Sequence, residues 1–170
     1  MPWQFPDMLK QITDAINVPN LTGEDIYCLS RFWDLIDQHA VDMIPPDLAT
    51  AGGILGTKKI RDYAQEHGVP MAMHFAGSPI CFMANVHCAA VTENAIAPEH
   101  HGIDVPWWED LVAGIEKPLN QKGFIRVPET PGRGVELNLD VVKQHLAAGD
   151  ECFGPTDEWN CRDSNDRPWS

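Results

Sequence analysis

The amino-acid sequence predicts an α/β protein in which parallel strands alternate with helices. Segments with apolar residues at helical spacing alternate with short apolar runs that are bounded by Pro or Gly. The repeat length of about 30 residues is typical of right-handed strand–helix–strand crossovers. In addition, titratable residues recur at the point where each predicted strand ends. The predicted order is a helix followed by a strand, repeated four times.

The first two helices are predicted over residues 5–17 and 27–40, because each carries an apolar face. The residues expected to point inward are Leu9, Ile12 and Ile16 in the first helix and Leu29, Phe32, Trp33 and Ile36 in the second. The apolar runs that follow, residues 18–25 and 40–47, are too short for helices. We therefore expect both runs to be buried strands.

The third helix is predicted over residues 52–68, with Ile60, Tyr63 and Ala64 inward and a glycine stop at its end. The fourth spans 78–94, where Ser78 is suited to the N-cap and Pro79 to the first helical position. Strands are expected at 69–73 and 95–101. The glycines at 52 and 53 follow the spacing GGxxG, which favours a tight turn over a dinucleotide-binding loop.

Each predicted strand ends on titratable residues. These residues are Glu24 with Asp25, then Asp47, His74 and Glu99. In a β/α barrel the carboxyl ends of the strands form the catalytic rim, so this pattern favours a barrel over an open sheet. A complete barrel needs about 250 residues, and the repeats in this chain of 170 residues cover less than half of that length. The sequence therefore predicts half of a (β/α)8 (TIM) barrel.

The composition excludes several classes of partner. The formal charge of −13 disfavours binding to nucleic acid and to anionic membrane surfaces. No segment has the length and apolarity of a membrane span, and the N-terminus lacks the layout of a signal peptide, so a cytoplasmic location is expected. The five cysteines form no CxxC pair, and we expect them to be reduced and mostly in the core.

Several motifs carry a family resemblance. The sequences TGED, VDMIPPDLATAGGILGTKKIRDYAQEHGVPMAMH, EHHGIDVPWWEDL and PGRGVELN resemble the C-terminal part of the enolase superfamily, in its mandelate racemase and muconate-lactonising branch. Within that branch the chain is most similar to acid-sugar dehydratases of the galactonate and mannonate type. The resemblance covers residues 1–146 and leaves 147–170 as an acidic C-terminal extension, expected to pack as an extension rather than hang free. It implies the C-terminal half of a TIM barrel, comprising strands five to eight.

The resemblance implies a role for each strand-end residue. Glu24 is similar to a metal-ligand carboxylate for Mg²⁺, although an acid there can also be a helix N-cap. Asp47 and His74 are similar to an aspartate–histidine pair in which the carboxylate orients the ring for proton transfer, whereas a lone histidine would more often be a satisfied core residue.

Glu99 is similar to the acid that donates a hydrogen bond to the substrate carboxylate, which requires a protonated, buried side chain. The alternative is an ordinary surface acid. Pro98 departs from the aliphatic residue expected before that acid, and it predicts a distorted strand end. Trp107 and Trp108 either wall the substrate pocket or cover the end of the barrel.

The function that the resemblance implies is that of a Mg²⁺-dependent sugar-acid dehydratase, of which this chain would be a C-terminal fragment carrying one metal ligand of three. Such an enzyme removes the proton α to a carboxylate and then eliminates water. The alternatives are a racemase or epimerase of the same superfamily, or a non-catalytic half-barrel that serves as a scaffold. Since unpaired strand edges promote association, a homo-oligomer is expected. The substrate would be a small sugar acid.

Overall fold

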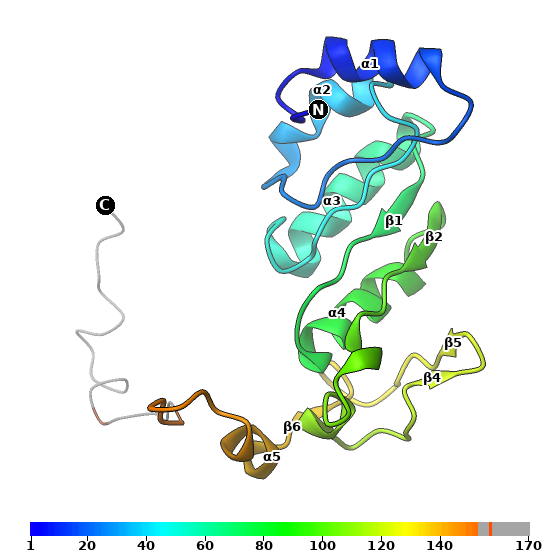
Figure 1. Cartoon of the computed structure of the whole chain (residues 1–170). Helices are drawn as coiled ribbons and strands as arrows, with labels where there is room; N and C mark the ends of the chain where they lie inside the picture. Colours follow the sequence, from blue (N-terminus) through cyan, green and yellow to red (C-terminus); the bar gives the residue numbers. More distant parts are fainter. Residues whose placement is uncertain (153–156, 158–170) are drawn as a thin grey trace.

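The computed structural model describes residues 1–152 and residue 157 (Figure 1). The α-helices are α1 Pro6–Ala15, α2 Trp33–Asp37, α3 Gly53–Glu66, α4 Pro79–Ala90 and α5 Leu139–Gln144. Single 3-10 turns are η1 Leu29–Arg31, η2 Gly102–Asp104 and η3 Glu109–Leu111. The strands are β1 Met71–Met73, β2 Ala95–Pro98, β3 Val112–Ala113, β4 Asn120–Gln121, β5 Phe124–Ile125 and β6 Glu136–Leu137.

The predicted alternation of helices with parallel strands is confirmed. β1 and β2 pair in parallel, and parallel bridges join Ile44 to Met71 and Leu21 to Met43. The segment after α1 therefore lies beside the segment after α2, which in turn lies beside β1, and β1 pairs with β2. A parallel sheet in sequence order brings the carboxyl ends of its strands to one edge. This arrangement positions the candidate site.

The first two predicted strands are much less regular than expected. Residues 18–25 and 40–47 contain isolated parallel bridges only. In the second segment Pro45 and Pro46 supply no N–H groups, so the ladder of hydrogen bonds cannot continue through them. The chain still follows the path of a strand there, because Ala72 donates to the carbonyl of Ile44 at 3.1 Å.

One predicted helix differs in its course from the structure. The second predicted helix is divided into η1 and α2, and Trp33 points outward, with 46% of its surface exposed. Phe32 and Ile36 are buried as predicted, Leu29 is partly buried, and Leu35 is buried in addition. The prediction that Trp33 points inward is therefore wrong. The third helix agrees with its prediction, and the fourth begins as predicted but ends at Ala90, before the predicted end at residue 94. Ser78 caps α4 by accepting a hydrogen bond from the N–H of Cys81 at 3.4 Å.

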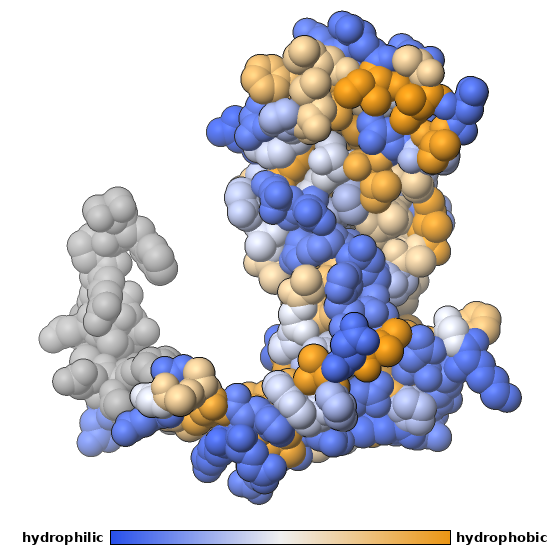
Figure 2. All heavy atoms as spheres, viewed as in Figure 1, coloured by the Kyte–Doolittle hydropathy of each residue, from blue (hydrophilic) through white to orange (hydrophobic). Residues whose placement is uncertain are grey.

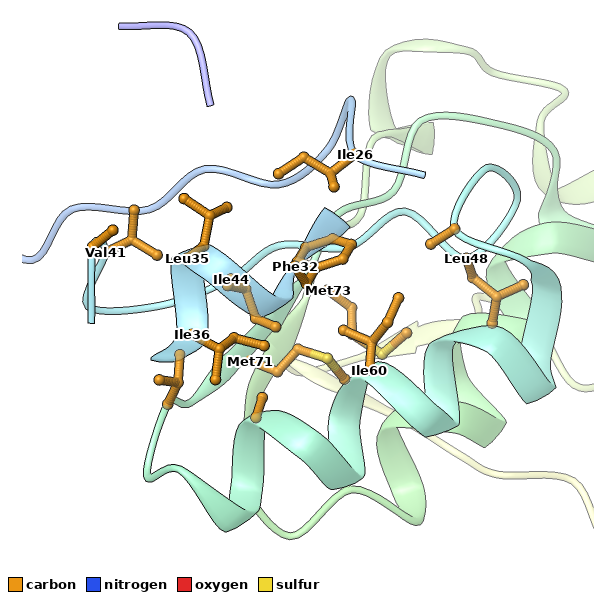
Figure 3. Packing of buried hydrophobic residues seen from close by; sticks show 14 of the residues in the cluster. Ile26, Phe32, Leu35, Ile36, Val41, Ile44, Leu48, Ile60, Met71 and Met73 are labelled. Carbon is orange, nitrogen blue, oxygen red and sulfur yellow. The ribbon is translucent and has the colours of Figure 1, made fainter. Parts of the chain in front are cut away.

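The buried apolar residues form two clusters. The larger cluster lies between α3, α2 and the parallel segments, and Figure 3 shows its side chains converging on Ile60 of α3 and on Met71 and Met73 of β1. The smaller cluster lies at the carboxyl ends of the strands and contains Phe75, Phe82, Met83, Val86, Trp108 and Leu119. The first cluster fixes the directions of the strands, and the second supports the loops that follow them.

An apolar surface remains exposed over α1. Figure 2 shows hydrophobic residues gathered at the end of the molecule that α1 forms. These exposed residues are Phe5, Met8, Ile12 and Ile16 along the helix and Val18 and Leu21 after it. The prediction that Ile12 and Ile16 point inward is therefore wrong, whereas Leu9 is buried as expected. No helix within the described part of the chain is long and apolar enough to cross a bilayer.

Other predictions concern the cysteines and the C-terminal extension. Cys88 is buried, but Cys28 is exposed and Cys81 and Cys152 are only partly buried, so the prediction of mostly core cysteines is wrong. All four are free thiols. Cys161 and most of the predicted extension lie outside the described residues.

Candidate functional site

The structure brings together four of the five strand-end residues that the sequence singled out: Glu24, Asp47, His74 and Glu99. His74 lies at their centre. Its Nδ1 is 2.8 Å from Oδ2 of Asp47, and its Nε2 lies 3.3 Å from a carboxylate oxygen of Glu24 and 3.7 Å from one of Glu99. Three carboxylates from three chain segments thus face the two nitrogens of one imidazole ring.

The Asp47 carboxylate is held on both of its oxygens. Oδ1 accepts a hydrogen bond from the backbone N–H of Ala49 at 2.7 Å, and Oδ2 faces His74. Asp47 is buried, with 8% of its surface exposed, and a parallel bridge pairs its backbone with that of His74. Because Asp47 occupies Nδ1, the ring nitrogen available for chemistry is Nε2.

Glu24 reaches the site because its chain segment lies very close to the next one. A Cβ at Gly23 would lie 2.9 Å from Pro45 and 3.0 Å from the ring of Phe32, so only glycine fits at this position. The Glu24 side chain itself remains 57% exposed. Asp25 is also exposed and takes no part in the ion pairs around His74.

Glu99 is fixed by the backbone of β1. Its carboxylate accepts a hydrogen bond from the N–H of Phe75 at 3.0 Å, and its own N–H donates to the carbonyl of Met73 at 3.0 Å. The register between β1 and β2 shifts just before it, where Met73 pairs with Pro98, so the predicted distortion is confirmed. The side chain is 49% exposed, and the burial expected for a proton-donating acid is therefore absent from the described structure.

Sequence reasoning missed two residues near His74. Asn85 of α4 is fully buried, and its Nδ2 donates to the backbone carbonyl of His74 at 3.1 Å. The sequence could have indicated Asn85, because it is a polar residue within a mostly apolar helix, ICFMANVHCAA. His101 is exposed, and its Nε2 lies 3.7 Å from the Glu99 carboxylate. It forms the outer margin of the site.

The tryptophans and the glycine turn have structural roles. Trp108 is buried against Phe75 and Phe82, and its Nε1 donates to the carbonyl of Gly77 at 2.8 Å, so it covers the strand ends. Trp107 stacks on His145 with ring centroids 3.9 Å apart. Gly52 and Gly53 have φ values of 107° and 69°, as a tight turn before α3 requires.

The described residues do not by themselves fit a Mg²⁺ site. Mg²⁺ takes near-octahedral oxygen ligands, usually one or two carboxylates together with water and substrate. Within residues 1–152 and 157, no group of three His, Cys, Asp or Glu side chains is arranged to hold a metal ion. The Glu24 carboxylate is exposed and faces His74, so it can supply one oxygen ligand at most alongside groups from elsewhere.

The fold and the site define a class of protein: a parallel α/β domain in which an imidazole contacts a buried carboxylate at the strand ends. Residues 1–141 match the model of the family described as Enolase C-terminal domain-like, and the chain belongs to this family. Solved structures agree. A mandelate racemase/muconate lactonizing enzyme-like protein from Rubrobacter xylanophilus superimposes with a TM-score of 0.85 at 33% identity, over 91% of this chain and 39% of that one.

A mandelate racemase/muconate lactonizing enzyme from Jannaschia sp. CCS1 gives a TM-score of 0.78 at 30% identity, over 89% of this chain and 38% of the other. Among curated relatives, the D-xylonate dehydratase of Haloferax volcanii is 39% identical over 90% of this chain and 37% of its own length. The D-galactonate dehydratase of Xanthomonas campestris is 31% identical over 75% and 34%. The chain thus spans a little over a third of the length of these relatives.

Proposed function

We propose that this chain supplies the last four strand ends of a sugar-acid dehydratase, a lyase that removes the proton α to a carboxylate and then eliminates water. The observation that carries the proposal is the geometry around His74, whose Nδ1 is held by Asp47 while Nε2 faces the open strand ends. The named relatives act on sugar acids, which supports a small, polyhydroxylated carboxylate as the substrate.

In this proposal His74 transfers a proton through Nε2. Asp47 fixes the ring orientation and stabilises the imidazolium form, because its buried carboxylate lies 2.8 Å from Nδ1. A ring held in this way can accept the α-proton, or it can protonate the β-hydroxyl as that group leaves as water. Glu99, anchored by the N–H of Phe75, would contact the substrate carboxylate.

We further propose Mg²⁺ as the cofactor and Glu24 as one of its ligands. Because the described residues do not form a complete metal site, the other ligands must come from further strands of the barrel. The same holds for the fold, since we propose that residues 1–146 form half of a (β/α)8 barrel and 147–170 an extension. Catalysis therefore requires this half to be joined to another.

A chimera tests the proposed function directly. Residues 1–141 of this chain would replace the matching segment of the Haloferax volcanii D-xylonate dehydratase, whose remaining length supplies the other strands. We expect Mg²⁺-dependent dehydration of D-xylonate or a related sugar acid, and loss of turnover on His74→Asn with the fold intact. A folded chimera with full turnover after His74→Asn would refute the role of His74. An epimerised, undehydrated product would indicate a racemase or epimerase instead.

A further inference from the structure

We infer that Asn85 is a positioning residue for His74, acting through the peptide group between His74 and Phe75. The side chain of Asn85 is fully buried in the middle of α4, and its Nδ2 donates to the His74 carbonyl at 3.1 Å. A carbonyl can only accept, so the amide nitrogen must face it and the orientation of the side chain is fixed.

The rest of the Asn85 amide has no other structural use among the described residues. Its Oδ1 is buried without a hydrogen-bond partner. An unsatisfied buried carbonyl oxygen destabilises the folded state, whereas an apolar residue of similar shape would avoid this cost. The single bond that Asn85 makes to the backbone of His74 is therefore the feature that distinguishes it from an apolar residue at this position.

The same peptide group is held from its other side. The N–H of Phe75 belongs to the peptide whose carbonyl Asn85 contacts, and it donates to Glu99 at 3.0 Å. The regular strand β1 ends at Met73, one residue earlier. Two side chains, one from α4 and one from the end of β2, thus hold this peptide just beyond the regular strand, next to the isolated parallel bridge between His74 and Asp47.

Holding both polar groups of a planar peptide fixes its orientation about the strand axis. This orientation limits the backbone angle of His74 and so the direction in which its Cβ points. The ring has to place Nδ1 2.8 Å from Asp47 while Nε2 faces Glu24. A side chain held at fixed geometry by surrounding hydrogen bonds is what general acid–base chemistry requires.

The inference rests on the proposed function only for the statement that His74 is catalytic. Its test uses the chain itself and needs no turnover. Asn85→Leu keeps the approximate shape and removes the donor. The matched control is Thr57→Val on α3, because Thr57 is also fully buried and its hydroxyl also has no partner in the described structure.

The measurement is ¹⁵N and ¹H NMR of the His74 ring, assigned by the loss of its signals in His74→Gln. We expect the Nδ1–H resonance of the unmodified chain to be preserved in Thr57→Val. In Asn85→Leu its exchange with water should become about tenfold faster, because one net hydrogen bond that positions the ring is lost. Unchanged His74 signals in a folded Asn85→Leu variant would overturn the inference.

A second measurement covers the case in which Asn85→Leu does not fold. In the unmodified chain the amide proton of Phe75 should exchange with deuterium at least about 100-fold more slowly than that of the exposed Ala76, because Glu99 holds it. The Asn85 side-chain amide should be protected as well. Exchange of both at the rate of free amides would overturn the inference, whereas an inactive chimera with these signals intact would reject only the proposed function.

Discussion

Asp47 and His74 are joined twice, once through a parallel bridge between their backbones and once through the 2.8 Å contact between Oδ2 and Nδ1. The backbone pairing sets the two Cα atoms side by side at the ends of adjacent strand segments. The side chains then point into the same space, because residues paired across a sheet lie on the same face. The contact between the Asp47 carboxylate and the His74 ring is thus a direct product of the sheet register.

Asp47→Asn should therefore separate charge from geometry. The amide keeps the size of the carboxylate but cannot stabilise an imidazolium, so we expect turnover of the chimera to fall by about 100-fold or more, with KM changed by less than about threefold. Steady-state kinetics provide the measurement. Asp62→Asn on α3 is the control, since Asp62 pairs with Lys58 and Arg61 of its own helix rather than with His74. Equal turnover in both variants would contradict the role of Asp47.

Gly102→Ala should destabilise the loop that covers the strand ends. An added Cβ would lie 2.4 Å from two ring atoms of Trp108, which is only 6% exposed and cannot move without repacking Phe75. We expect the free energy of unfolding to fall by about 1–3 kcal/mol in urea denaturation.

Gly77→Ala is the matched control for Gly102→Ala, because its added Cβ would lie at an ordinary 3.6 Å from the ring of Phe75. It should change stability by less than about 1 kcal/mol. A loss as large as that of Gly102→Ala would contradict the assignment of the Gly102→Ala effect to its close contact with the ring of Trp108.

The residues of the site can be predicted from the sequence more reliably than the packing around them. The strand-end pattern predicts only that Asp47 and His74 share one edge of a parallel sheet, and it is the resemblance to the enolase superfamily that implies their pairing. Helices α3 and α4 could be predicted because their glycine stop, proline and serine cap act locally. The helix signals depend on residues that are close together along the chain, whereas Asp47 and His74 are 27 positions apart.

The features that the sequence does not predict are burial and side-chain contacts that depend on other elements of the fold. The periodicity of α1 identifies an apolar face but cannot tell whether another element covers it, and Ile12 and Ile16 are exposed. The burial of Glu99 likewise depends on what lies over the strand end. The bond from Asn85 to His74 joins a helix to the strand before it, so no local pattern predicts it. Tertiary contacts decide all three.

The cysteine environments predict an order of alkylation. Burial raises the pKa of the Cys88 thiol, and burial, with a smaller contribution from the charge of Asp47, raises the pKa of Cys81. A raised pKa lowers the thiolate fraction at any given pH, so both should react more slowly with iodoacetamide at pH 8 than the exposed Cys28. Peptide mass spectrometry over time measures the rates, with urea-unfolded protein as control. Alkylation of Cys88 as fast as Cys28 in native buffer would contradict the described packing.

The two open edges of the parallel sheet predict self-association. Within the described residues, Leu21 lies at one edge and β2 at the other, and Leu21 and Ile96 are 44% and 60% exposed. Unpaired edges beside apolar surface favour pairing with another chain, so we expect species larger than the 18.9 kDa monomer in sedimentation velocity.

The formal charge of −13 opposes this association, so added salt, which screens the repulsion, should strengthen it. A charge placed at the edge should weaken it, and Ile96→Lys is expected to raise the dissociation constant by about tenfold or more. Leu55→Lys on α3 is the matched control, because Leu55 is 66% exposed but lies on a helix away from both edges. A monomer that persists at all salt and protein concentrations would show that these edges do not pair with those of a second copy.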